Sequence, residues 1–138
     1  MTPPRLHLLL DGGRRVYFPG ERVAGSYWLE SAAQAEPTAV EVSVLWHTQG
    51  KGDEDLAVHY FDRRTLDPAA HPCPLEQPQR FASLLPPSPL SYEGVIVKIR
   101  WCVRVRVFLR RGKDLVAEQP FQLGNVPAAR AVLPAESG

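Results

Sequence analysis

The feature that most constrains the fold is a stretch of strict alternation in the last third of the sequence. From Val97 to Leu109 every second residue is apolar. The residues between them are mostly cations, namely Lys98, Arg100, Arg104 and Arg106, and Arg110 follows just beyond. Because successive side chains of a strand point to opposite faces, this pattern predicts a long strand with one apolar and one basic face. We expect it to be a central strand of a β-sandwich.

A second stretch, from Ala39 to His47, alternates in the same way. Val40, Val42, Val44 and Trp46 fall on one face, and Glu41, Ser43, Leu45 and His47 fall on the other. The two stretches together predict a core that includes Val42, Val44, Trp46, Ile99, Trp101, Val103 and Val105.

Shorter apolar runs bounded by turn residues predict the remaining strands. They are Leu6 to Leu10, Val16 to Phe18, Val23 to Leu29, Leu56 to Phe61, Gln79 to Leu85 and Leu115 to Leu123. About eight or nine strands without a long amphipathic helix predict an all-β protein, an antiparallel immunoglobulin-like β-sandwich. The chain of 138 residues suits one domain. We assign residues 1–123 to the sandwich and residues 124–138 to a flexible C-terminal tail.

The connections are less regular. Residues 31–37 read as a linker, with a helical turn as the alternative. Residues 67–78 contain prolines at 68, 72, 74 and 78, and because proline lacks the N–H that a sheet needs, we expect a mobile loop. Tyr92 to Gly94 predicts a turn into the long strand, with Tyr92 packed as a corner residue.

The charge balance excludes a strong general attraction to nucleic acid or membrane, because the formal net charge is only +1. A basic site must therefore be local. Cys73 and Cys102 show no metal-ligand spacing and no evident disulfide, and the N-terminal run is too short and too interrupted for a signal peptide or a membrane span. We expect a reduced protein in the cytoplasm.

Residues that could carry chemistry do not form a recognisable set. His7, His47, His59 and His71 are scattered, and His71-Pro72-Cys73 has no second half at a suitable spacing. Asp53-Glu54-Asp55 lacks the alternating oxygen ligands of a calcium loop, and no glycine-rich segment precedes a helix. We therefore predict no catalytic activity, no metal and no organic cofactor.

Several short motifs resemble the N-terminal domain of arrestins. Pro19-Gly20-Glu21 is followed by Val23 and Gly25, Phe81 to Leu85 ends in prolines, and Ser91-Tyr92-Glu93-Gly94 leads into Ile99 to Val103. The same order is similar to the related domains of the arrestin-fold retromer subunit and of bacterial sporulation-control proteins. The resemblance covers Leu6 to Leu123, one lobe of a two-lobed family, so the sequence looks like a single-lobed, bacterial-type member. It implies a non-catalytic adaptor or scaffold that binds proteins through sheet edges, loops and a basic surface.

Two functional hypotheses remain open. The first is an arrestin-like protein-binding module whose candidate site is the basic row Lys98, Arg100, Arg104, Arg106 and Arg110, with an acidic or phosphorylated peptide as partner. The second is a binder of polyanion through the same row, either anionic lipid at a peripheral membrane contact or nucleic acid. DNA is not expected. The row is also poorly suited to stacking with the bases of a single-stranded nucleic acid, because Phe108 is its only aromatic residue. A solvated face, neutralised by neighbours such as Glu41 or Glu118, is the alternative to both. Exposed sheet edges could also join copies of the chain or add a partner strand.

Overall fold

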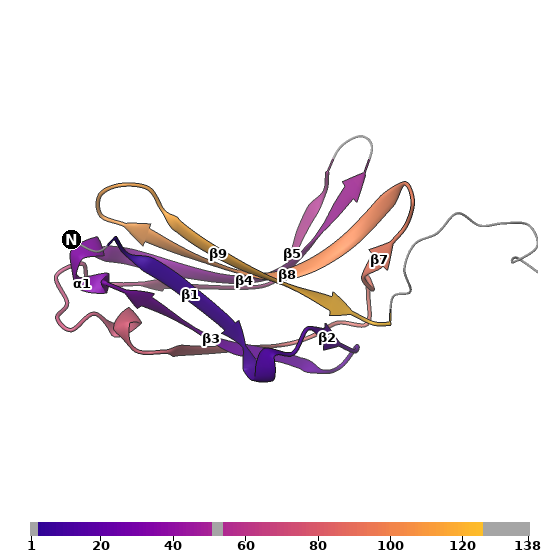
Figure 1. Ribbon diagram of the computed structural model, residues 1–138, viewed down its shortest axis with the longest axis horizontal. Coiled ribbons are helices and arrows are strands. Elements are labelled where there is room, and N and C mark those ends of the chain that lie inside the picture. The colour runs from indigo at the N-terminus through magenta and orange to yellow at the C-terminus, as the bar shows by residue number, and fades with distance from the viewer. Residues whose placement is uncertain (1–2, 51–53, 126–138) are drawn as a thin grey trace, which may run out of the picture.

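Two β-sheets pack face to face in the computed structural model, which describes residues 3–50 and 54–125 (Figure 1). The strands are β1 (Arg5–Leu10), β2 (Val16–Tyr17), β3 (Arg22–Glu30), β4 (Pro37–Gly50), β5 (Leu56–Thr65), β6 (Gln79–Leu84), β7 (Tyr92–Glu93), β8 (Val97–Leu109) and β9 (Leu115–Leu123). The predicted all-β sandwich is confirmed. The predicted C-terminal tail falls almost entirely on residues 126–138, which lie outside the described residues.

The long alternating strand occupies the position predicted for it. One sheet has the order β1-β3-β6, and the other has the order β2-β9-β8-β4-β5, with β7 also pairing with β8. β8 thus lies between β9 and β4, and its bounds match the predicted stretch from Val97 to Leu109. The pairings are antiparallel except for that between β2 and β9, which is parallel.

The core lies between the two sheets. Val103, Val105 and Val107 of β8 are fully buried there, and Val23 and Leu29 of β3 close it from the opposite sheet. Of the predicted core residues, Val42, Val44, Trp101, Val103 and Val105 are buried.

Trp46 and Ile99 are only partly buried, so the predicted core extends too far along both strands. Figure 1 shows the reason. The ends of β4, β5 and β8 diverge from the three-stranded sheet and extend beyond it. The alternation continues into this arm, but the opposite sheet no longer covers it.

Four local predictions differ from the structure. Residues 32–35 form the short helix α1 (Ala32–Ala35), so the helical-turn alternative is correct and the linker is not. β5 continues through the charged residues 62–64 because β4 pairs with it as far as Ala39. Pro74–Glu76 forms a 3-10 helix whose Leu75 is fully buried, which anchors the predicted mobile loop. Tyr92 belongs to β7 and is 52% exposed, so it is not a packed corner residue.

Candidate functional site

The predicted basic row lies on the outer face of the six-stranded sheet. Its residues alternate along β8 with the apolar row that faces the opposite sheet from Trp101 to Val107, so Lys98, Arg100, Arg104 and Arg106 lie on the other side. Directly opposite on β4, His47 faces Arg100, Ser43 faces Arg104 and Glu41 faces Arg106. Arg110 follows the end of the strand. Polar and charged side chains of β4 and β8 therefore face one another on this side of the sheet.

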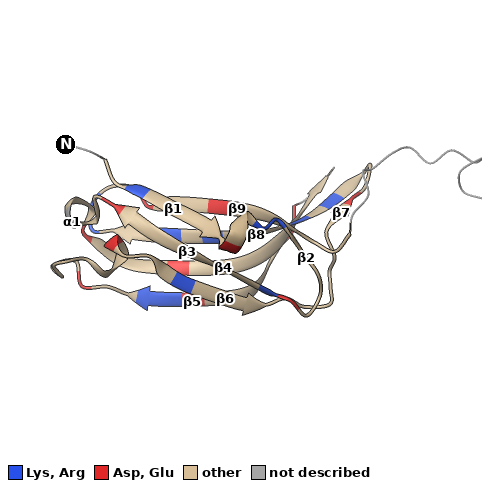
Figure 2. Ribbon diagram, turned by 60° about the horizontal axis from the view of Figure 1, so that its bottom comes forward, with Lys and Arg blue, Asp and Glu red and all other residues tan. Residues whose placement is uncertain are grey.

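Most cations of the row have a carboxylate partner. Arg104 pairs with Glu118 at 2.8 Å, Arg100 with Glu93 at 3.0 Å, Lys98 with Glu93 at 3.8 Å and Arg110 with Glu36 at 3.2 Å. Glu118 is thus one of the two predicted neutralising neighbours, whereas Glu41 pairs with Arg63 of β5 at 2.6 Å. Figure 2 accordingly shows the two signs of charge interspersed over the strands.

Arg106 differs from the rest of the row. Within the described part of the chain it forms no ion pair, and its guanidinium carbon lies 5.8 Å from the centre of the Phe108 ring. Arg63 approaches the same ring at 5.1 Å. Two guanidinium groups therefore meet one aromatic ring at this end of the outer face, a geometry that favours cation–π attraction.

The middle of the outer face is apolar and closely covered. Leu45 and Cys102 are paired in register and are 1% and 4% exposed, although the alternation predicts Leu45 to point outward into solvent. Burial, with a further contribution from Glu118, raises the pKa of the Cys102 thiol to about 11. Leu45 and Cys102 thus form the floor of the outer face. A hollow of about 270 Å³ adjoins this floor and is lined by His47, Gln49, Arg100, Trp101, Cys102, Glu118 and Pro120. The floor does not carry a reactive thiol.

Three apolar side chains line the same face along β5. Leu56, Val58 and Phe61 are 52%, 50% and 54% exposed, and they lie opposite His47, Leu45 and Ser43 of β4. β5 is the last strand of the six-stranded sheet, so its far edge pairs with no strand in residues 3–50 and 54–125. An unpaired edge with exposed apolar side chains is a template for adding another strand.

A β-bulge keeps these three side chains on one face. The register between β4 and β5 shifts between Val44 and Leu45, so that His59 is the extra residue. The His59 Nε2 lies 2.7 Å from the carbonyl oxygen of Leu84 in β6, and its ring meets Trp101 edge to face at 6.0 Å between ring centres. The extra residue is therefore held on the inner side, and Val58 and Phe61 both remain outward.

The opposite edge of this sheet is less open. β9 carries Pro120, which has no N–H to donate, and β2 pairs with Gln122 and Leu123. The sequence predicted exposed edges in general but did not single out β5. Its only signal is the run from Leu56 to Phe61, which has no proline or glycine.

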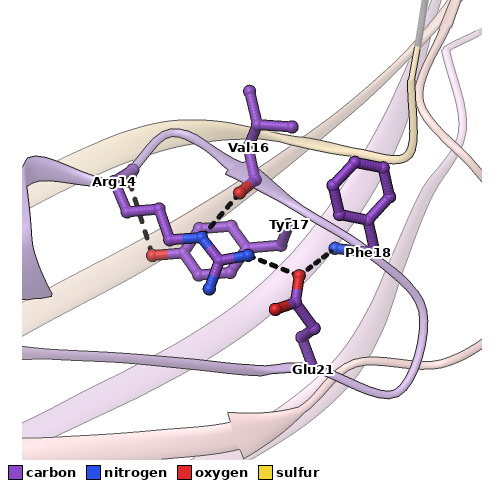
Figure 3. A network of polar contacts seen from close by, with 5 residues as sticks. All are labelled: Arg14, Val16, Tyr17, Phe18 and Glu21. Carbon is purple, nitrogen blue, oxygen red and sulfur yellow. Dashed lines mark hydrogen bonds and ion pairs between the residues drawn. The ribbon is translucent and has the colours of Figure 1, made fainter.

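The turn motif that carried the family resemblance has a structural role here (Figure 3). Glu21 accepts a hydrogen bond from the Phe18 N–H at 2.7 Å and pairs with Arg14, which also donates to the Val16 carbonyl at 2.8 Å. The hydrogen bond from Arg14, followed by that from Phe18, lowers the pKa of the Glu21 carboxyl. Gly20 has a φ of 83°, which a residue with a Cβ adopts only under strain. The motif fixes the connection between β2 and β3.

Among the described residues, no three His, Cys, Asp or Glu side chains are grouped so that they could hold a metal ion. No helix in that part of the chain has the length and apolar character needed to cross a membrane.

Comparison with known proteins identifies the fold. No protein-family model matches the sequence, and no curated protein matches it. Solved structures do match, among them the crystal structure of Spo0M, a sporulation control protein from Bacillus subtilis, with a TM-score of 0.61 and 15% sequence identity. The fold is arrestin-like. The match covers 91% of this chain and 51% of that chain, so the protein spans about half the length of its structural neighbour.

This likeness confirms the resemblance to sporulation-control proteins at the level of the fold. At 15% identity it concerns the fold alone, and it carries no partner or activity across to this chain. Evidence for a function comes from the surfaces of this chain itself.

Proposed function

We propose that this arrestin-like domain is a non-enzymatic protein-interaction module, an adaptor or scaffold, that holds an extended segment of a partner protein along β5. One observation carries the proposal. The unpaired edge of β5 coincides with three half-exposed apolar side chains, Leu56, Val58 and Phe61, all on the outer face. Backbone groups on such an edge supply affinity to an added strand, and alternate side chains supply specificity.

The chemistry of the surface indicates what kind of segment fits. Each of the three side chains is about half covered already, so complete burial by a partner would contribute on the order of 1 kcal/mol apiece. Farther along the face, Arg106 has no ion-pair partner among the described residues. We expect a segment with apolar residues at alternate positions and an acidic or phosphorylated residue that reaches Arg106.

The alternative function, binding of a polyanion by the basic row, has weaker support. Lys98, Arg100, Arg104 and Arg110 each have a carboxylate within 4 Å, so a polyanion would have to compete with those carboxylates. Added salt separates the two functions, because binding that tracks phosphates weakens steeply with salt and strand addition does not.

The experiment compares two substitutions at opposite edges of the same sheet. Val58→Lys puts a charge on the proposed edge, and Val16→Lys puts one on β2 at the opposite edge, where Val16 is 41% exposed. Immobilised protein is incubated with extract of the native cell, the partner that the wild type retains is identified, and its binding segment is mapped with overlapping peptides. We expect Val58→Lys to lose that peptide and Val16→Lys to keep it.

Hydrogen exchange with the mapped peptide locates the contact. Strand addition should slow the exchange of β5 amides from Leu56 to Phe61. Protection confined to another strand, or equal loss of binding in the two lysine variants, would place the partner elsewhere and refute the proposed edge.

A further inference from the structure

A second surface, on the β7 and β9 side of β8, has the composition of a small-molecule site. It lies where β8 changes its neighbour on one side: β9 pairs with it as far as Trp101, and β7 takes over at Ile99. Arg100, between these two residues, pairs with neither strand on that side. The hollow at this break has a volume of about 250 Å³, and its lining includes the charged residues Arg15, Glu93 and Arg100 beside apolar residues such as Ile99 and Pro120.

The hollow has an apolar wall and a polar rim. Trp101 and Phe121 belong to the core, with ring centres 5.9 Å apart, and Ile99 and Pro120 continue the apolar lining. The rim combines two guanidinium groups, one hydroxyl, one amide and one carboxylate. Apolar walls with a few convergent polar groups are typical of ligand sites.

Arg15 is fixed by its backbone and free at its guanidinium. Its carbonyl oxygen accepts a hydrogen bond from the Gln122 N–H at 2.8 Å, which holds the residue at the rim. The adjacent Arg14 is occupied by Glu21 and by the Val16 carbonyl (Figure 3). The exposed side chain of Arg15, by contrast, has no hydrogen-bond or ion-pair partner among residues 3–50 and 54–125. Its charge is therefore available to a ligand.

Arg100 has unused donor capacity on the other side of the hollow. One of its terminal nitrogens pairs with Glu93 at 3.0 Å, but its Nε–H is buried without an acceptor in the described structure. A buried donor that lacks an acceptor is unfavourable. A small rotation that brings this guanidinium onto a ligand oxygen would remove that penalty.

We propose that this hollow binds a small monocarboxylate with a flat apolar body. The charged residues of its lining are Arg15, Arg100 and Glu93, which leaves one uncompensated positive charge and favours a single negative charge on the ligand. The carboxylate lies between the two arginines, whose planar forks match its oxygens, and the apolar body lies on Ile99 and Pro120, which are not fully buried. The volume is below the range of roughly 300 to 1,000 Å³ that suits drug-sized molecules, so the ligand is of about the size of one substituted ring.

Phenylacetate is the probe for this site, and its uncharged analogue phenylacetamide is the control ligand. The indole N–H of Trp101 donates to the Pro89 carbonyl at 2.8 Å, so its NMR cross-peak is a sharp reporter at the wall of the hollow. The peak is assigned by its absence from Trp101→Phe. We expect phenylacetate to shift it saturably, with binding about tenfold weaker in Arg15→Gln and in Arg100→Gln. Arg106→Gln, on the outer face, should leave the affinity unchanged.

Three results would overturn the proposal. Equal binding of phenylacetamide would show that the carboxylate is not recognised. Unchanged affinity in Arg15→Gln would show that Arg15 does not bind the ligand. Because Arg15 is exposed, this substitution should not disturb the fold. The same saturable shift with inorganic phosphate alone would indicate a general anion site. None of these results bears on partner capture at β5, because the two surfaces share no residue.

Discussion

The indole Nε1 of Trp101 donates a hydrogen bond to the carbonyl oxygen of Pro89 at 2.8 Å. This bond joins the centre of the core to the proline-rich segment before β7. Because the ring is 1% exposed, we expect Trp101→Ala to lower the free energy of unfolding by about 3 to 5 kcal/mol. Trp101→Phe retains an aromatic ring but leaves the carbonyl unpaired, at a cost of about 1 to 3 kcal/mol.

Denaturant unfolding measures both effects, and Trp28→Phe is the control. Trp28 is partly exposed on the outside of β3, where it stacks on His7, so its substitution should have a small effect. An unchanged stability in Trp101→Ala would contradict the position of the ring in the core.

The length of β8 could be predicted from sequence because alternation is a local property. Its thirteen residues reveal their two faces without any knowledge of their neighbours. Coverage is not local: Ile99 continues the apolar row but lies where the opposite sheet has ended, and Leu45 points outward yet is buried. Both outcomes depend on how the sheet bends against its partner.

The candidate site was predictable to a similar degree. The sequence placed four cations on one face and named Glu118 as a neutralising neighbour, but it could not say which cation Glu118 meets. Glu118 reaches Arg104 because β8 and β9 pair in that register. The apolar stripe of β5, formed by Leu56, Val58 and Phe61, could not be predicted for another reason. The extra residue His59 breaks the alternation. Val58 and Phe61 therefore lie on the same face, although strict alternation would place them on opposite faces.

Gly25 provides a second test of packing, now in the three-stranded sheet. A Cβ added there would lie 2.3 Å from the Leu9 carbonyl oxygen and 2.9 Å from Cζ of Phe81. The first contact is with backbone, which cannot rotate away, so we expect Gly25→Ala to destabilise the protein by about 1 to 3 kcal/mol. Ala24→Ser, one residue away on the outer side, should change thermal stability little. If Gly25→Ala had the melting temperature of the wild type, this would contradict the close approach of β1 and of the Phe81 ring to Gly25 in β3.

Stability should fall at acid pH through two exposed carboxylates. The hydrogen bond from Arg14 lowers the pKa of Glu21 below its ordinary 4.5, and the hydrogen bond from Arg80 lowers the pKa of Asp11 below its ordinary 3.8. A carboxyl whose pKa is lower in the folded state stabilises the protein above the unfolded pKa and loses that contribution as the pH falls through the folded pKa. The midpoint of urea unfolding should therefore decrease below pH 4.5. The double variant Glu21→Gln with Asp11→Asn should show a flatter decrease, and an identical slope would exclude these two groups.

Neither cysteine should react with thiol reagents in the folded protein. Cys73 and Cys102 are 5% and 4% exposed, and the Cys102 pKa of about 11 leaves roughly one thiolate in a thousand at pH 8. We expect no modification by iodoacetamide under native conditions and modification of both thiols in denaturant, as measured by intact mass. Rapid native labelling of Cys102 would show that the floor of the outer face is open to solvent.

The basic row gives the last prediction. Replacement of both Arg104 and Arg106 by glutamate should leave the fold intact, because an exposed ion pair such as that of Arg104 with Glu118 contributes at most about 1 kcal/mol. It should weaken capture of an acidic partner segment, and more so at low salt, where charge repulsion is less screened. Arg106→Glu alone should account for most of the loss, since Arg104 already has a carboxylate and Arg106 has none among the described residues. The swap of Arg104→Glu with Glu118→Arg is the matched control, because it restores the pair and leaves the net charge of the two positions unchanged. Binding of the peptide mapped with the wild type is measured across a salt series. Should the double variant retain full binding at every salt concentration, the row is a solvated face and the apolar stripe of β5 binds the partner without it.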